Sequence, residues 1–289
     1  MSALRGAGCT RRTARSANIA WSLHLNGSEC TAYSLRGWLH LRSPHTSSPL
    51  EEWNMASDSP LTFNQAVRGI TEFIEVAIHT ILYVRQVYPA ELFVRRKKYN
   101  TPVFQSRHPA LNEYISGAIK AIGDELFLGN VDKVVVVIKN KEDVALERFI
   151  FATRNLIQVE SYNKDTSVEG AISSASLGQY FRSFLIKLSM IEAQLGQLCL
   201  NDLSFAIILE LQDDKVPTAT NEKEPPPWIP AITQHTTSGA SENAELHMIR
   251  AVDTGIINLS FAVQESEQKL MMERDMRKAE DPKGKQRAS

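Results

Sequence analysis

The most informative pattern of apolar and polar positions lies between Thr62 and Tyr88. Read at helical period, its polar residues form one narrow stripe at steps of four, three, four and seven, made of Arg68, Glu72, Glu75, His79 and Gln86. Nearly every other direction is apolar, which is typical of a helix enclosed by other elements. Thr62 and Gln65 have the capping-box spacing, and Pro89 ends the pattern. We predict a buried central helix, and the ionisable residues in its stripe argue against a membrane span.

The pattern after Pro89 predicts further helices and strands. Two short apolar pieces around a turn signal indicate a hairpin, and its basic run 95–98 is either a solvated edge or a phosphate-binding or nuclear-targeting sequence. A helix is expected from Pro109 to Gly129. A strand buried on both faces, 134–138, is expected to turn back into an antiparallel partner, 144–151. A third helix, 177–195, and strands 203–211 and 257–263 complete the pattern.

The segment from Gln212 to Gly255 has no sustained period, although a half-buried strand follows it. Loops longer than about 15 residues inside a compact domain are uncommon and are usually functional or disordered. Because a strand resumes at Ile257, we expect the loop to connect two positions in a sheet. Within it, PPPWIP (225–230) is either a polyproline ligand or a place where Trp228 anchors the loop or grips a peptide; its location favours the second use. Beyond Gln264 we expect a charged, solvated tail.

Residues 1–57 differ in composition from the rest of the chain. The first fifty residues hold six arginines, no lysine and a single acid, Glu29. This composition is that of a mitochondrial transit peptide. The alternative, which we favour, is a disordered or wrongly predicted extension in front of a natural start at Met55.

Charge and cysteine content narrow the function classes. The chain has 32 basic and 33 acidic residues, so no global field favours nucleic acid as the main ligand. Its three cysteines, Cys9, Cys30 and Cys199, form no CxxC pair, which excludes a disulfide scaffold and the usual structural zinc site. No nucleophile elbow, phosphate loop or zinc-protease motif occurs. We expect a protein that has no enzymatic activity and binds no metal and no cofactor. His79 beside Glu75 could be a general base, but a structural histidine is favoured.

With these residues in view, the chain resembles the HORMA-domain family, and within it the non-catalytic subunits of the translesion DNA polymerase zeta. The resemblance rests on five stretches: 73–89, 95–102, 108–115, 132–138 and 226–229. It implies an α+β HORMA fold, with three helices packed on a mainly antiparallel sheet and a C-terminal safety belt that closes over an extended peptide. The implied HORMA domain is 58–265 (core 58–211, belt 212–265), between the extension 1–57 and a charged tail, 266–289.

The resemblance also implies binding residues. Tyr114 and Trp228 match residues that hold a proline-rich peptide of the polymerase zeta catalytic subunit, and Leu246 matches one that serves the peptide and a neighbouring interface with a scaffold translesion polymerase. Arg182 matches an arginine used in HORMA–HORMA dimers. Ser260 and Ala262 stand where larger residues are expected to meet the scaffold polymerase, which puts that contact in doubt. Ordinary helix packing for Tyr114 and solvated surface for Arg182 are the alternatives.

The function implied by the resemblance is that of a nuclear, non-enzymatic adaptor of translesion DNA synthesis. Such an adaptor needs no cofactor, no membrane and no sequence-specific DNA binding. The alternative within the family is a HORMA adaptor in spindle-checkpoint or meiotic chromosome signalling. A more distant alternative, from the N-terminal composition, is an enzyme acting in mitochondria.

Overall fold

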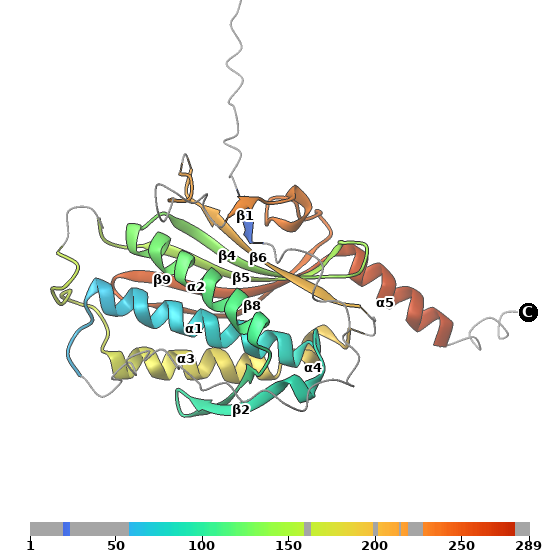
Figure 1. Ribbon diagram of the computed structural model, residues 1–289, viewed down its shortest axis with the longest axis horizontal. Helices are drawn as coiled ribbons and strands as arrows, with labels where there is room; N and C mark the ends of the chain where they lie inside the picture. Colours follow the sequence, from blue (N-terminus) through green and yellow to red (C-terminus); the bar gives the residue numbers. More distant parts are fainter. Residues whose placement is uncertain are drawn as a thin grey trace, which may run out of the picture.

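The computed structural model describes residues 20–23, 58–158, 163–198, 202–213, 215–218 and 228–280, without side chains for 20–23 and 276–280. These residues form an α+β fold built on an antiparallel, seven-stranded sheet. Helices α1 (Phe63–Val84), α2 (Pro109–Leu128) and α3 (Ser174–Ser189) lie together on one side of that sheet (Figure 1). The predicted fold class is confirmed.

Helix α1 begins at the capping box that the sequence predicts. The Thr62 hydroxyl accepts the N–H of Gln65, and the Gln65 side chain accepts the N–H of Thr62. The helix ends at Val84, four residues earlier than expected, and Gln86 adopts a positive φ of 52°. At this point Arg85 donates two hydrogen bonds to the carboxylate of Glu147 on a distant strand, at 2.9 and 2.7 Å. That tertiary ion pair fits the early helix end, and local sequence cannot show it.

The hairpin and the second helix follow the predicted boundaries. After a short 3-10 turn, Ala90–Leu92, strands β2 (Phe93–Lys98) and β3 (Thr101–Ser106) pair antiparallel. Both turn residues, Tyr99 and Asn100, have positive φ angles of 47° and 54°, as the tightest hairpin turns require. Helix α2 starts at Pro109, and Gly129 ends it in the left-handed conformation.

The sheet order is β7-β1-β6-β4-β5-β9-β8. Four of these strands correspond to predicted ones, namely β4 (Val131–Lys139), β5 (Ala145–Asn155), β6 (Ser204–Leu211) and β9 (Ile257–Glu265). The others are β1 (Ala20–Leu23), β7 (Ile229–Pro230) and β8 (Glu245–Asp253). Chain order and sheet order therefore differ most at the β7 edge, where β1 lies between β7 and β6.

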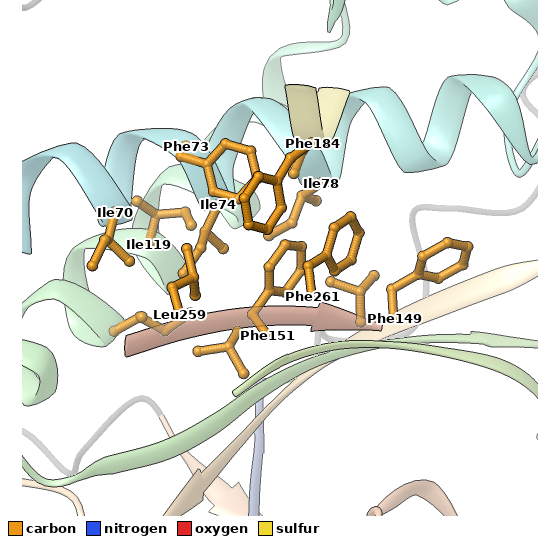
Figure 2. Close-up of a cluster of buried hydrophobic side chains, with 14 of the residues drawn as sticks. Ile70, Phe73, Ile74, Ile78, Ile119, Phe149, Phe151, Phe184, Leu259 and Phe261 are labelled. Carbon is orange, nitrogen blue, oxygen red and sulfur yellow. The ribbon is translucent and has the colours of Figure 1, made fainter. Parts of the chain in front are cut away.

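The main core lies between the helices and the sheet. Figure 2 shows Phe73, Ile74 and Ile78 of α1 above Phe151 and Phe261 of the strands. The rings of Phe151 and Phe261 stack with centroids 4.3 Å apart, and Phe73 meets Phe151 edge-on at 6.1 Å. A smaller buried cluster occupies the opposite sheet face, made of Val135, Val137, Ala145, Ile150 and Ile208.

Three strands, β1, β7 and β8, lie where none was expected. Strand β1 falls within residues 1–57, where we expect a disordered or wrongly predicted extension. Ala20–Leu23 are not disordered, and 1–19 and 24–57 lie outside the described residues. Strand β8 falls in the segment that shows no period. Only Ile249 and Val252 of β8 are buried, and a register shift between Met248 and Arg250 breaks the alternation. A bulged edge strand therefore hides its own pattern.

The residues after Gln264 are not simply a solvated tail, which corrects that expectation. Helix α5 covers Glu267–Glu280, and Figure 1 shows it leaving the end of the sheet. Its Lys269 side chain is 3% exposed and pairs with Glu147 at 2.7 Å and with Glu265. The predicted third helix is also divided, because a turn at Met190 separates α3 from the short α4 (Glu192–Leu195). Among the described helices, none has the length and hydropathy needed to cross a bilayer.

Candidate peptide-binding site

The edge of β6 is the centre of the candidate site. Strand β6 does not pair with β7 directly; β1 lies between them and is antiparallel to both. Trp21 of β1 is opposite Leu209 on one side and Pro230 on the other. Neighbouring strands lie about 4.8 Å apart, so β6 and β7 flank a single strand position, which β1 fills. We name this space, bounded by 207–210 and 229–230, the strand slot.

Tyr114 lies at one end of the strand slot. Its hydroxyl accepts the N–H of Ile207 at 3.4 Å, and Ile207 is the β6 residue opposite Leu23, the last residue of β1. The Tyr114 ring meets Phe205 edge-on with centroids 5.6 Å apart. Burial raises the pKa of Tyr114, so the hydroxyl keeps its proton. The predicted binding residue therefore lies where the ladder between β6 and β1 ends.

Trp228 lies on the other side of the strand slot, immediately before β7. Its side chain is 3% exposed and belongs to the main core. The next residue, Ile229, is opposite Ser22 of β1. The indole is therefore part of the packed core and is not exposed on the loop. Because Trp228 directly precedes β7, its burial anchors the start of that strand beside the slot.

Residues 228–244, which we name the belt segment, begin at the β7 edge of the sheet and then cross the sheet face that lies away from the helices. The segment starts at β7 on one edge and leads into β8, which pairs with β9 at the opposite edge. In Figure 1 the orange chain between these strands lies on the side away from the helices. Ala231 packs against the smaller apolar cluster on that face. A strand in the slot is therefore held under a chain that spans the sheet.

Glu210 of β6 fastens the middle of the belt segment. Its buried carboxylate accepts the N–H of Thr237 at 2.6 Å and the Thr237 hydroxyl at 2.5 Å. Lys133 of β4 reaches the same carboxylate at 3.3 Å. Burial opposes the charge of Lys133, but Glu210 and Asp132 raise its pKa, so the lysine stays protonated. Glu210 is also opposite Ala20, so this contact lies at the far end of the slot from Tyr114.

Arg148 of β5 and Asp143 hold the preceding turn of the belt segment, Thr233–His235. The Arg148 guanidinium donates to the carbonyl oxygens of Gln234 and His235, the latter at 3.3 Å. The His235 ring nitrogen Nε2 lies 2.8 Å from the carbonyl oxygen of Asp143. Burial lowers the pKa of His235. Because a carbonyl oxygen can only accept, Nε2 carries the hydrogen of this hydrogen bond. We name these contacts, together with those of Glu210, the belt latch.

The remaining predicted binding residues lie on the other side of the molecule. Leu246 is 57% exposed on edge strand β8, at the opposite end of the sheet from β7. Arg182 is exposed on α3, next to Ser183, whose hydroxyl accepts a hydrogen bond from Arg250 of β8 at 3.1 Å. On β9, Ser260 is half-buried and Ala262 is buried. The structure therefore separates Leu246 from Tyr114 and Trp228, and groups Leu246 with the predicted partner interface.

One cluster has groups that could hold a metal ion. Ligand atoms of Glu245, His247 and Glu265 lie within 4.8 Å of one another. His247 Nε2 is 2.8 Å from Glu265, and Gln194 lies 3.0 Å from the other ring nitrogen. Lys269 already pairs with Glu265. These hydrogen bonds and ion pairs connect β8 to β9 and α5, so the cluster serves as a structural network.

The histidine singled out in the central helix has a structural environment. His79 is 4% exposed, and its Nδ1 accepts the N–H of Ser106 at 3.4 Å. Burial lowers the pKa of His79 from 6.5 to about 4, so the ring is neutral at pH 7. Glu75 is partly buried, and burial followed by repulsion from Glu72 raises its pKa. These contacts fit the favoured reading of a hydrogen-bonded histidine.

Comparison with known proteins decides the family. The HORMA-domain profile matches residues 67–256. The chain belongs to the HORMA-domain family. Over 216 residues it is 34% identical to the zebrafish (Danio rerio) mitotic spindle assembly checkpoint protein MAD2B, covering 72% of this chain and 95% of the relative. It is 37% identical over 136 residues to the DNA polymerase zeta processivity subunit of Schizosaccharomyces pombe, covering 46% of this chain and 63% of the relative.

Solved structures share this HORMA fold. A chain in the crystal structure of the mitotic checkpoint complex matches with a TM-score of 0.56 at 19% identity, covering 69% of this chain and 98% of that one. Caenorhabditis elegans HTP-2, solved bound to the HIM-3 closure motif, matches with a TM-score of 0.55 at 10% identity, covering 71% and 91%. At these identities the likeness shows the fold alone.

Sequence reasoning missed the belt latch of this HORMA domain. Glu210 and Arg148 each interrupt an apolar strand, and such polar positions look solvent-facing when only one sheet face is expected to be covered. The one sequence signal for these contacts was the length of the segment after β6, because a segment that connects two sheet positions has to cross a face of the sheet. Their partners, Thr237 and Gln234, lie in a region without period, so no local pattern could pair them.

Proposed function

We propose that this protein is a non-enzymatic adaptor of translesion DNA synthesis: a HORMA subunit of DNA polymerase zeta that clamps a proline-rich peptide of the catalytic subunit. The observation that carries the proposal is the strand slot, one strand wide and crossed by the belt segment. Relatives in S. pombe and Arabidopsis thaliana carry the name DNA polymerase zeta processivity subunit, which directs the choice of partner.

Binding in the strand slot follows the physics of strand addition. Main-chain hydrogen bonds to β6 supply affinity that depends little on sequence, and side-chain pockets at alternate positions supply selectivity. Trp228 and Tyr114 border the slot, so they are placed to shape those pockets. The peptide leaves only when the belt segment detaches from Glu210 and Arg148. Release is then limited by belt opening, which favours slow dissociation.

The opposite edge of the sheet gives the adaptor a second interface. Leu246 and Met248 are exposed on β8, beside α3 with its exposed Arg182. This surface is our proposed docking site for the scaffold translesion polymerase and for pairing of two HORMA domains. Because the two edges are separated by the whole sheet, one molecule holds both partners at once and bridges them. We place this assembly in the nucleus.

A second function has its own support. The zebrafish and human relatives are named mitotic spindle assembly checkpoint protein MAD2B. The same slot and belt would then capture a peptide of a checkpoint or meiotic chromosome protein. Both functions use one clamp, and they differ in the identity of the captured peptide.

Affinity purification of the tagged full chain from its own cells, followed by mass spectrometry, separates the two. Recovery of the polymerase zeta catalytic subunit supports the proposal, and recovery of checkpoint regulators without it supports the second function. The same purification with the variant Leu246→Glu tests the second interface, because this substitution changes the β8 surface and leaves the slot intact. It should lose the scaffold polymerase and keep the catalytic subunit; parallel loss of both would contradict the assignment of two separate edges.

A further inference from the structure

The strand that fills the slot comes from the chain itself. All four residues of β1 are in register with β6, from Ala20 opposite Glu210 to Leu23 opposite Ile207. On its other side, Trp21 and Ser22 are in register with β7. A strand paired on both sides occupies an internal position in the sheet, so β1 covers the edge of β6 that a partner peptide needs.

The belt segment is organised around this occupant. Strand β7 consists of Ile229 and Pro230, and the ladder described for it is with β1. Pro230 has no N–H to offer a further strand, so the sheet ends there. The slot therefore takes one strand and no more. Within the described residues, its position between β6 and β7 is already taken.

The chain is long enough for β1 to reach this position within one molecule. The 34 residues between Leu23 and Asp58 can span about 110 Å when extended, at roughly 3.3 Å per residue. Helix α1, with 22 residues, measures only about 33 Å. The connection is therefore long enough for β1 to pair with β6 of the same molecule.

We propose that residues Ala20–Leu23 are an internal occupant of the strand slot, which a partner peptide must displace. This inference rests on the proposed function, because it assigns a regulator to the same slot. The occupant satisfies the exposed N–H and C=O groups of β6 and so blocks unspecific strand addition. It also lowers the apparent affinity for a peptide from another protein, because only the molecules with an empty slot can bind one.

The occupant also defines the class of partner that replaces it. Such a partner is an extended segment antiparallel to β6. It pairs over more than the four residues of β1, or fills the side-chain pockets near Trp228 and Tyr114 better. A short unstructured peptide with no such contacts is rejected. Selectivity then comes from competition with a sequence that the chain carries.

Hydrogen–deuterium exchange of the full chain tests the occupant without any partner. The N–H groups along β6 point alternately to β4 and to β1, so within residues 207–210 the amides that face β1 report its pairing. Ser22→Pro removes a ladder donor from a strand paired on both sides. It should accelerate exchange of these amides at least about tenfold and leave α1 unchanged, whereas Ser34→Pro, outside β1, should have no effect. Equal exchange across residues 207–210 in all three chains would overturn the proposal.

A second measurement uses a labelled synthetic peptide of residues 17–27 as the probe. In fluorescence anisotropy it should bind the Ser22→Pro chain at least about ten times more tightly than the unchanged chain, because only the variant has an empty slot. A peptide that itself carries Ser22→Pro should bind neither. The proposal would be refuted if the first peptide bound both chains equally well, or if it bound neither chain.

Light scattering distinguishes the chain's own strand from that of a second copy. The unchanged chain and Ser22→Pro should have the same oligomeric state in the absence of partners. A dimer that becomes a monomer on Ser22→Pro would assign β1 to a second copy and overturn the arrangement in cis. Failure to recover polymerase zeta from cells would refute the proposed function and leave these partner-free results standing.

Discussion

Removal of the Glu210 carboxylate should loosen the belt segment without unfolding the domain. Glu210 belongs to β6, which is paired on both sides, whereas its partner Thr237 belongs to the belt segment. The bonds between them exist only while the belt segment lies on the sheet. Glu210→Ala therefore changes the free energy of belt opening, with a much smaller effect on global unfolding.

The magnitude follows from the contacts. Glu210 accepts two hydrogen bonds from Thr237, at 2.6 and 2.5 Å, and pairs with Lys133 at 3.3 Å. A hydrogen bond to a charged group contributes about 1.5–3 kcal/mol, and a buried N–H left without acceptor costs about 1–3 kcal/mol. Against this, alanine no longer has a buried charge to desolvate. We expect a net loss of about 2–3 kcal/mol, which makes opening about 30 to 150 times more frequent.

Amide exchange across residues 233–240 is the assay, because it reports local opening directly. Thr237→Val keeps the backbone N–H bond to Glu210 and loses the hydroxyl bond, so it should accelerate exchange by only about fivefold, for about 1 kcal/mol. Glu242→Ala removes an exposed carboxylate from the same segment and serves as the control. If Glu210→Ala exchanges no faster than Glu242→Ala in this region, the belt latch does not hold the belt.

Three other substitutions test the fold around the site. Trp228→Ala should lower the free energy of unfolding by about 3–5 kcal/mol in a urea titration, because the indole is buried in the core. His79→Gln should flatten the pH dependence of the free energy of unfolding. Because the pKa of His79 is lowered from 6.5 to about 4, the folded domain keeps this stability above pH 6.5 and loses about 3 kcal/mol as the pH falls from 6.5 to 4. Lys269→Ala should cost about 1.5–3 kcal/mol in the same titration and increase amide exchange in α5, because Glu147 and Glu265 lose one buried cation but keep Arg85 and His247.

Each of these has a clear contrary outcome. A Trp228→Ala chain as stable as the unchanged one would mean that the indole is not packed. An identical acid profile for His79→Gln would assign the pH dependence to other groups. Unchanged exchange in α5 after Lys269→Ala would show that the helix docks without its ion pairs.

The central helix and its neighbours could be predicted because their signals are local. The Thr62 cap, the Asn100 turn and the Gly129 terminator act within a few residues, and the apolar stripes report directly which faces are buried. The same holds for β4, β6 and β9. Element type and approximate boundaries there follow from the chain alone.

The edges and the site could not be predicted in this way. Strand β1 consists of four residues without a recognisable period, and its position depends on pairing with β6, almost 190 residues away. Helix α5 reads as a charged tail because the partners of Lys269, Glu147 and Glu265, lie on strands β5 and β9. Tyr114 and Trp228 came from family resemblance, and only the fold places them at the two sides of one slot.

Photo-cross-linking from the strand slot tests the central claim most directly. A photoreactive amino acid in place of Ile229, which is 47% exposed on β7, reports what lies in the slot of the full chain inside cells. The same probe at Met190, exposed at the end of α3, is the control. The expected result is a cross-link from position 229, absent from position 190, to a proline-rich segment of the polymerase zeta catalytic subunit. Cross-links from 229 to checkpoint proteins alone, or the same products from both positions, would contradict it.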